Sequence, residues 1–128
     1  MTPATSPILV IEDEPAVLSF IQSALERSGF AVAPAVSGAE ALPMLASGRF
    51  RCVISDMRTP GGINGADVHA FIAAERPDLL GRMLFITGDI VNEETRRVLR
   101  DTGVPCIEKP FRVHQLISAV KRLCPQAE

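Results

Sequence analysis

Four short apolar runs dominate this chain, and each one ends abruptly at a polar or charged residue. They are ILVI (8–11), CVIS (52–55), MLFI (83–86) and VPCI (104–107), and a weaker run, AVAPA, covers 31–35. Apolar runs without alternation are typical of strands that are buried on both faces, as in a parallel sheet. We therefore expect five strands that pair in parallel.

Helical signals occupy the segments between these runs. Pro15 suits the first turn of a helix, and Gly29 suits the end of the same helix. Ser37 can cap a second helix that runs through Leu45. Pro43 lies inside that second helix and lacks a backbone N–H, so it predicts a kink or a short extra helix.

Three further helices are expected along the second half of the chain. They surround residues 68–72, 92–100 and 113–123, and the helix at 92–100 is charged and suited to solvent exposure. The glycine-rich connection 59–65 predicts a mobile or rebuilt loop. Alternating strands and helices favour a parallel sheet with helices on both of its faces.

The length of 128 residues fits a single domain. We assign residues 8–124 to that domain, residues 1–7 to a disordered N-terminal tail and residues 125–128 to a short C-terminal tail. The chain has no basic excess, since its formal net charge is −2, which argues against nucleic acid as a partner. No apolar stretch is long enough for a membrane span.

The three cysteines are an odd number without metal-ligand spacing. Cys52, Cys106 and Cys124 form no CxxC pair and no cluster with histidine. This usage indicates free thiols in the reducing environment of a cytoplasm, where we expect the protein to reside.

Chemically active side chains follow the apolar runs. Glu12 and Asp13 follow the first run, Asp56 the third, Thr87 the fourth and Lys109 the fifth. Ligands of open α/β sheets bind beyond the carboxyl ends of the strands, so we expect these five side chains to share one edge.

That combination of groups suits the transfer of a phosphoryl group. Neighbouring carboxylates repel each other unless a cation lies between them, and carboxylate oxygens suit Mg²⁺. Aspartate is a nucleophile toward phosphoryl groups, and a metal and a lysine can offset the charge on the transferred group.

Four segments carry a resemblance to a known family. They are ILVIEDEP (8–15), VISDMRTP (53–60), FITGD (85–89) and EKPF (108–111). In this order and spacing, the chain resembles the receiver domain of response regulators in two-component signalling, from about residue 8 to residue 123. The resemblance implies a flavodoxin-like doubly wound fold with strand order 2-1-3-4-5 and five helices.

The family resemblance assigns roles to the acidic residues. Asp56 is the expected phosphoacceptor. Glu12 and Asp13 are expected to hold Mg²⁺ (or Mn²⁺) together with Asp56 and the backbone carbonyl of Arg58. The only catalysis expected is phosphorylation of the chain itself and its slow reversal, so we do not expect an enzyme that acts on other substrates.

The resemblance also assigns the residues that sense the phosphoryl group. Thr87 is the expected switch hydroxyl, Lys109 is expected to pair with the phosphoryl group, and the Lys109–Pro110 bond is expected to be cis. Cys106 departs from the family pattern, because receiver domains usually place Tyr or Phe three residues before the lysine. The smaller cysteine leaves open how the switch is relayed.

Arg58 and Asp89 lie two residues after Asp56 and Thr87, at positions that flank the phosphoryl site in this family. We hypothesise that their side chains pair over the pocket and limit the access of water.

The expected partner is a histidine kinase or a histidine phosphotransfer protein, which supplies the phosphoryl group. Three outputs remain open: a downstream target protein, further transfer in a relay, or action within a parent hybrid kinase. No DNA-binding segment follows residue 123, so we expect a receiver without an output domain. It would be a monomer or a weak dimer through the face formed by 92–100, 104–107 and 113–123.

Two alternatives compete with this interpretation. An aspartate-nucleophile phosphatase would carry a second acid two residues after Asp56, where this chain has Arg58. A phosphorylation-independent interaction module would be compatible with Cys106 in place of the usual aromatic residue. It would not account for an acidic pocket that is complete with Thr87 and Lys109.

Overall fold

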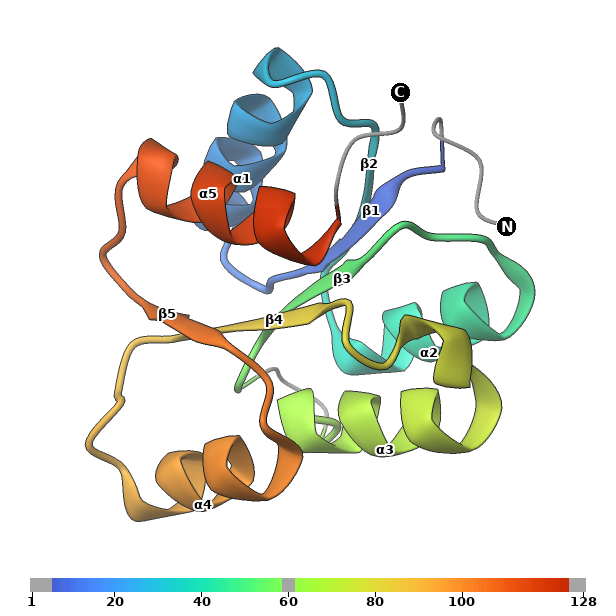
Figure 1. The fold of residues 1–128 in the computed structure, drawn as a ribbon, viewed down its shortest axis with the longest axis vertical. Helices are drawn as coiled ribbons and strands as arrows, with labels where there is room; N and C mark the ends of the chain where they lie inside the picture. The colour runs from blue at the N-terminus through green and yellow to red at the C-terminus, as the bar shows by residue number, and fades with distance from the viewer. Residues whose placement is uncertain (1–5, 59–61, 125–128) are drawn as a thin grey trace.

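A parallel sheet forms the centre of the molecule (Figure 1). In the computed structural model, which describes residues 6–58 and 62–124, the strands are β1 (Ile8–Ile11), β2 (Val32–Ala35), β3 (Val53–Asp56), β4 (Met83–Thr87) and β5 (Cys106–Glu108). All neighbouring pairs are parallel, and the order is β2-β1-β3-β4-β5. The flavodoxin-like topology expected from the sequence is therefore confirmed.

Helices cover both faces of this sheet. They are α1 (Pro15–Arg27), α2 (Gly38–Ser47), α3 (Gly65–Glu75), α4 (Glu93–Thr102) and α5 (Val113–Leu123), with a short 3₁₀ turn, η1 (Pro77–Leu79), after α3. Figure 1 shows α1 and α5 together on one side of the sheet and α2, α3 and α4 on the other. Each strand–helix–strand unit thus returns the chain to the same edge of the sheet.

Residue alternation along β1 divides the core into two layers. Ile8 and Val10 pack with the apolar faces of α1 and α5, whereas Leu9 and Ile11 pack with those of α2 and α3. All four side chains are buried. A strand that is apolar on both faces is therefore required here, which explains the continuous apolar run.

Polar side chains fix the first turns of three helices. Ser37 accepts a hydrogen bond from the backbone of Glu40, and Asn92 accepts one from Thr95. Asn64 and Asp67 form a reciprocal capping box at the start of α3. These caps satisfy N–H groups that the helix cannot pair, and they fix where each connection from the sheet ends.

The structure decides two predicted details. Of the two outcomes predicted for Pro43, the short extra helix does not form, because Pro43 lies inside a single α-helix. Its missing N–H would have faced the carbonyl of Ala39, an exposed residue whose carbonyl water can reach. The last strand begins at Cys106 instead of residue 104, and the ladder starts with the carbonyl of Pro105, which accepts from Phe85. Proline cannot donate to a ladder, which delays the strand.

Part of the predicted N-terminal tail packs against the domain. Ser6 is buried, and the carbonyl of Pro7 accepts a hydrogen bond from the backbone N–H of Arg51 at 2.9 Å. Residues 1–5 of that tail, the predicted C-terminal tail at 125–128 and residues 59–61 of the predicted mobile loop lie outside the described residues. Within the described residues, no helix is long and apolar enough to cross a membrane.

Candidate functional site

The five side chains that were predicted to share one edge of the sheet lie together at that edge. Glu12 and Asp13 follow β1, Asp56 ends β3, Thr87 ends β4, and Lys109 follows β5. The register brings these strand ends level, since Ile11 of β1 lies beside Ser55 of β3 and Asp56 beside Ile86 of β4. A pocket of about 330 Å³ opens there, lined by Asp13, Glu14, Asp56, Arg58, Thr87, Gly88, Asp89 and Lys109.

Lys109 is the cation at the centre of the acidic residues. Its Nζ lies 2.8 Å from Oδ2 of Asp56 and 3.0 Å from Oε1 of Glu12. A longer contact of 3.5 Å reaches Oε1 of the exposed Glu14. Burial opposes the charge of the ammonium, but the hydrogen bonds and the negative charge of Asp56 and Glu12 outweigh it and raise the pKa of Lys109 above its usual value.

Glu12 is the most deeply buried of the acids, with a side chain only 1% exposed. Its Oε2 accepts a hydrogen bond from the backbone N–H of Glu14 at 3.1 Å. Its Oε1 makes the ion-pair contact with Lys109 but, among the described residues, accepts no hydrogen bond of good geometry. Burial raises the pKa of Glu12 and the charge of Asp56 adds to this, while the Glu14 N–H and Lys109 oppose it.

The acidic residues fit a hard divalent cation. Glu12, Asp13 and Asp56 each offer one carboxylate oxygen, and the three oxygens lie within 4.8 Å of one another. Oxygen donors of this kind match Mg²⁺, which keeps several waters and takes few carboxylates. Among the described residues, the buried Oε1 of Glu12 makes only the ion-pair contact with Lys109, so it is the acceptor that such an ion or its water would satisfy.

Asp56 and Thr87 are both held by backbone groups. The N–H of Arg58 donates to Oδ1 of Asp56 at 3.2 Å, so each carboxylate oxygen of Asp56 has a donor. Oγ1 of Thr87 accepts from the N–H of Asp89 at 3.1 Å, and the carbonyl of Thr87 accepts from the N–H of Lys109 at 2.7 Å. The hydroxyl therefore connects the end of β4 to the segment that leads into α4.

Comparison with known proteins identifies the family of the chain. A sequence model of the response regulator receiver domain matches residues 8–121. The chain belongs to this family. Receiver domains are the phosphoacceptor modules of two-component systems, generally bind Mg²⁺ in their acidic pocket, and interact with histidine kinases and downstream effectors.

Three curated relatives illustrate the setting in which such receivers occur. The C4-dicarboxylate transport transcriptional regulatory protein DctD of Rhizobium meliloti is 31% identical over 93% of this chain and 25% of its own length. The sensor kinase CckA of Brucella abortus is 29% identical over 93% of the chain and 12% of its own length. The transcriptional regulatory protein PrrA of Mycobacterium tuberculosis is 31% identical over 95% and 52%. The chain thus spans between 12% and 52% of the length of these relatives.

Solved receiver structures share the fold. A response regulator receiver protein from Sinorhizobium medicae is 29% identical and superposes with a TM-score of 0.80, covering 93% of this chain and 94% of that one. The receiver domain of a histidine kinase from Syntrophus aciditrophicus is 27% identical with a TM-score of 0.81, covering 92% and 89%.

Arg58 and Asp89 both line the receiver pocket, and both side chains are exposed. No ion pair joins them among the residues that the structure describes, so the predicted pairing does not form. Each flanks the pocket separately, because a favourable pair between exposed side chains stabilises too little to hold two long groups together.

Cys106 lies in β5, half-buried, and packs against the core layer of α2 and α3. Its thiol contacts the carbonyl of Ile107 at 3.6 Å. Burial raises the pKa of Cys106 to about 11, and the charge of Glu108 adds to this. The thiol therefore stays protonated at neutral pH and behaves as a small apolar side chain.

The Lys109–Pro110 bond is cis, as the family resemblance implied.

The sequence did not predict two features of the site. One is the contact of Glu14 with Lys109. An acid at position 14 is equally typical of a residue that favours the start of α1, so its sequence position does not indicate this contact. The other is a groove of about 440 Å³ next to the pocket, lined by Ala16, Val17, Phe20, Lys109, Pro110 and Phe111. The signal for this groove in the sequence was Phe20, a large apolar residue of α1 that the structure shows to be exposed.

Proposed function

We propose that this chain is a phosphoacceptor receiver in which Asp56 takes a phosphoryl group from a phosphohistidine of a histidine kinase or a histidine phosphotransfer protein. The observation that carries the proposal is the contact of Lys109 with Asp56 at 2.8 Å inside a group of acids. An ammonium in contact with the acceptor carboxylate is suited to pair with the charge of the incoming phosphoryl group.

The expected step is a displacement at phosphorus. An oxygen of Asp56 forms a bond to phosphorus while the bond from phosphorus to the donor's imidazole nitrogen breaks, and the imidazole leaves with the electron pair. Glu12, Asp13, Asp56 and the carbonyl of Arg58 would hold Mg²⁺ (or Mn²⁺). When bound, this ion offsets negative charge on the phosphoryl oxygens.

Thr87 is the residue proposed to report the phosphoryl group. In the unphosphorylated chain its hydroxyl accepts from the N–H of Asp89. A phosphoryl oxygen is a strong acceptor, so the hydroxyl would turn to donate to it. The segment from Asp89 to α4 would then change, and with it the binding of a downstream partner.

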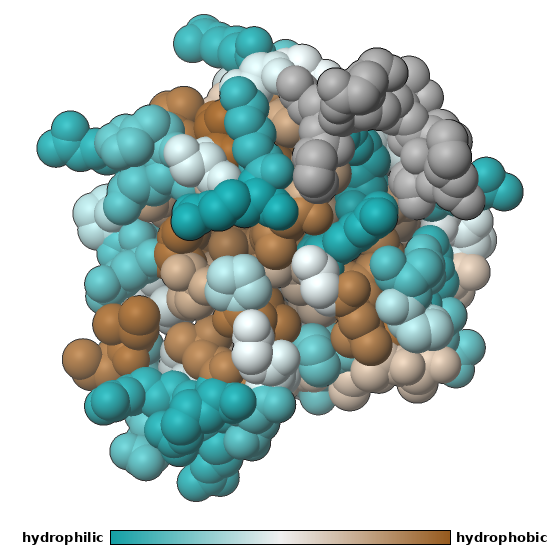
Figure 2. Space-filling model, viewed as in Figure 1, coloured by the Kyte–Doolittle hydropathy of each residue, from teal (hydrophilic) through white to brown (hydrophobic). Residues whose placement is uncertain are grey.

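The face formed by α4, β5 and α5 is the proposed output surface, either for a target protein or for a second copy. Figure 2 shows hydrophilic side chains gathered over α4 on the viewed face. The charged residues of this helix are exposed, as the sequence predicted: Glu93, Glu94, Arg96, Arg97, Arg100 and Asp101. A partner of this surface would therefore be recognised mainly by charge.

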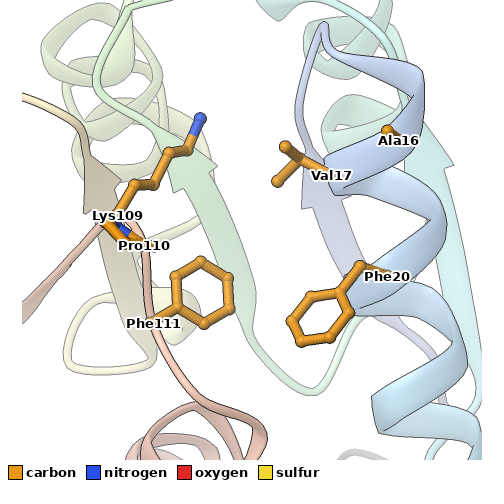
Figure 3. Close-up of a pocket in the computed structure, with 6 residues that line it drawn as sticks. All are labelled: Ala16, Val17, Phe20, Lys109, Pro110 and Phe111. Carbon is orange, nitrogen blue, oxygen red and sulfur yellow. The ribbon is translucent and has the colours of Figure 1, made fainter.

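The apolar groove beside the pocket is the proposed docking site for a helix of the phosphodonor protein. Figure 3 shows the rings of Phe20, from α1, and Phe111, from the segment before α5, facing each other, with Lys109 at the edge of the groove. The ring centroids are 5.8 Å apart, and Phe20 is 43% exposed. Because Lys109 borders both groove and pocket, a donor protein that reaches Asp56 would also cover the groove.

Incubation with Mg²⁺ and acetyl phosphate, followed by intact-mass measurement, tests the phosphoacceptor proposal. We expect the wild type to gain the mass of one phosphoryl group and Asp56→Asn to gain none. Asp101→Asn, which changes an exposed aspartate of α4, is the matched control and should behave like the wild type. An unmodified wild type would favour the phosphorylation-independent interaction module.

Phe20→Ala tests the docking proposal separately. We expect unchanged labelling by acetyl phosphate but slower transfer from any kinase or phosphotransfer protein that phosphorylates the wild type. Val91→Ala, which removes an exposed apolar group elsewhere, should leave both reactions unchanged. Equal transfer rates for Phe20→Ala and the wild type would reject the groove as the docking site.

A further inference from the structure

Glu14 directs its carboxylate toward the phosphoryl site. It is the N-cap residue of α1, but within the described residues its side chain makes no capping hydrogen bond. Its Oε1 lies 3.5 Å from Nζ of Lys109 instead, although the two residues are 95 positions apart in the sequence. Glu14 also lines the pocket that contains Asp56. The side chain therefore belongs to the surroundings of the acceptor carboxylate.

The backbone of Glu14 is fixed at this place. Its N–H donates to Oε2 of Glu12 at 3.1 Å, and its carbonyl accepts from the N–H of Leu18 at 2.9 Å. Pro15 follows, and a residue before proline is restricted to extended backbone, which Glu14 adopts with φ −83° and ψ 114°. These constraints keep the side chain, which is 63% exposed, at the mouth of the pocket.

Three carboxylates share the ammonium of Lys109. Its Nζ lies 2.8 Å from Asp56, 3.0 Å from Glu12 and 3.5 Å from Glu14. An ammonium has three N–H donors, so a phosphoryl oxygen that pairs with Lys109 must take the place of one carboxylate. We expect Glu14 to give way, since its contact is the longest and its side chain is the most exposed of the three.

An incoming anion meets a pocket that is rich in negative charge. A phosphoryl group that displaces Glu14 from Lys109 leaves the Glu14 carboxylate beside it without its cation. Like charges at such short range repel, and the repulsion grows with the charge of the donor. The residues that line the pocket include four acids, Asp13, Glu14, Asp56 and Asp89, and two cations, Arg58 and Lys109.

We propose that Glu14 is a specificity-determining residue, whose negative charge at the mouth of the pocket disfavours small dianionic phosphodonors that reach Asp56 from solution. This proposal rests on the proposed function, because it concerns the rate at which Asp56 is phosphorylated. A protein donor meets the same charge, but binding in the apolar groove beside the pocket can offset the repulsion. A small donor has no such binding energy, so Glu14 favours protein donors.

Two small donors of different charge test the role of Glu14. At neutral pH acetyl phosphate is mostly a dianion, whereas phosphoramidate is mostly a monoanion with a protonated nitrogen. With either donor, an oxygen of Asp56 forms a bond to phosphorus while the bond to the leaving group breaks. Acetate leaves in the first case, and ammonia leaves in the second. Intact mass followed over time at saturating Mg²⁺ gives the rate of each reaction.

We expect Glu14→Gln to react about fivefold faster than the wild type with acetyl phosphate, but only about twofold faster with phosphoramidate. The repulsion from one carboxylate doubles with the charge of the donor, so the rate factor is squared. Glu14→Asp keeps the charge and should stay near the wild type. Glu26→Gln, which removes an exposed carboxylate at the other end of α1, should match the wild type with both donors.

Added potassium chloride provides a second measurement that a purely structural role would not affect. Salt screens exposed charges, so it should speed the reaction of the wild type with acetyl phosphate more than that of Glu14→Gln. A wild-type rate that does not rise with salt would contradict the proposal, and this measurement does not depend on whether a variant folds.

The outcomes with the two donors separate this proposal from the proposed function. Equal acceleration of Glu14→Gln with both donors would mean that a contact, and not a charge, was lost. An unchanged or slower Glu14→Gln would mean that Glu14 does not repel the donor. Either result would overturn the proposal alone. A wild type that neither donor phosphorylates would overturn the proposed function as well.

Discussion

Nζ of Lys109 lies 2.8 Å from Oδ2 of Asp56 and thereby ties the end of β5 to the end of β3 across β4. The same ammonium contacts Glu12 at 3.0 Å. Asp13 also belongs to this acidic group, but no ion pair of Asp13 is found among the described residues. Negative charge at this edge therefore exceeds what one lysine offsets, and the fold retains repulsion that a cation can relieve.

Mg²⁺ should accordingly stabilise the folded chain. A ligand at ten times its Kd raises the free energy of unfolding by about 1.4 kcal/mol, and the melting temperature should rise with it. Asp13→Asn should raise the melting temperature without metal and weaken the further rise with Mg²⁺. Asp101→Asn, outside the pocket, should respond to Mg²⁺ as the wild type does. An identical Mg²⁺ response in Asp13→Asn would contradict the role of Asp13.

Thr87 should couple phosphorylation to the segment after β4 through the amide of Asp89. In the unphosphorylated wild type this amide donates to Oγ1 of Thr87, and a hydrogen bond worth about 1 kcal/mol slows solvent exchange of the amide roughly fivefold. Phosphorylation should speed that exchange. In Thr87→Ala the amide should exchange fast from the start and show no further change, whereas Thr87→Ser should resemble the wild type. Hydrogen exchange followed by NMR measures this difference.

The sequence predicted the site because parallel strands bring their carboxyl ends to one edge. Each of Glu12, Asp13, Asp56, Thr87 and Lys109 lies at or just after a strand end, so the chain order alone placed them together. Their roles needed the family resemblance, since spacing does not distinguish a nucleophile from a metal ligand.

What the sequence could not predict depends on side-chain contacts between distant segments. Cys52 and Cys124 share one buried layer because α5 packs back across the sheet to the start of β3, and no local pattern records that. The sequence also could not decide the effect of Pro43, because a proline inside a helix is tolerated where water can reach the carbonyl that loses its partner, as at the exposed Ala39.

Arg58 should prolong the life of the phosphorylated form. Its exposed side chain lines the pocket, where we expect it to occupy space that an attacking water needs. Arg58→Ala keeps the backbone N–H that donates to Asp56, so only the side chain is tested. A barrier lowered by about 1 kcal/mol would shorten the lifetime roughly fivefold. Decay of the phosphorylated mass after removal of acetyl phosphate measures it, with Arg96→Ala as the control. An unchanged lifetime of phosphorylated Arg58→Ala would contradict this role of the Arg58 side chain.

Cys106 should react slowly with iodoacetamide until the solution is strongly alkaline. Burial raises its pKa from 9.0 to about 11, and only the thiolate is alkylated. The unfolded chain releases this proton near pH 9.0 and the folded chain near pH 11, so ionisation of Cys106 favours unfolding as the pH rises between these values.

Mass spectrometry of the Cys106 peptide at a series of pH values measures this reaction. The alkylation rate should keep rising tenfold for each pH unit past pH 9, instead of levelling near the pKa of 9.0 that an unperturbed thiol has. Cys106→Ser should also lose less stability than the wild type between pH 9 and pH 11. An alkylation rate that levels near pH 9 would mean that the Cys106 thiol is exposed. It would contradict the packing of this side chain against the core layer of α2 and α3.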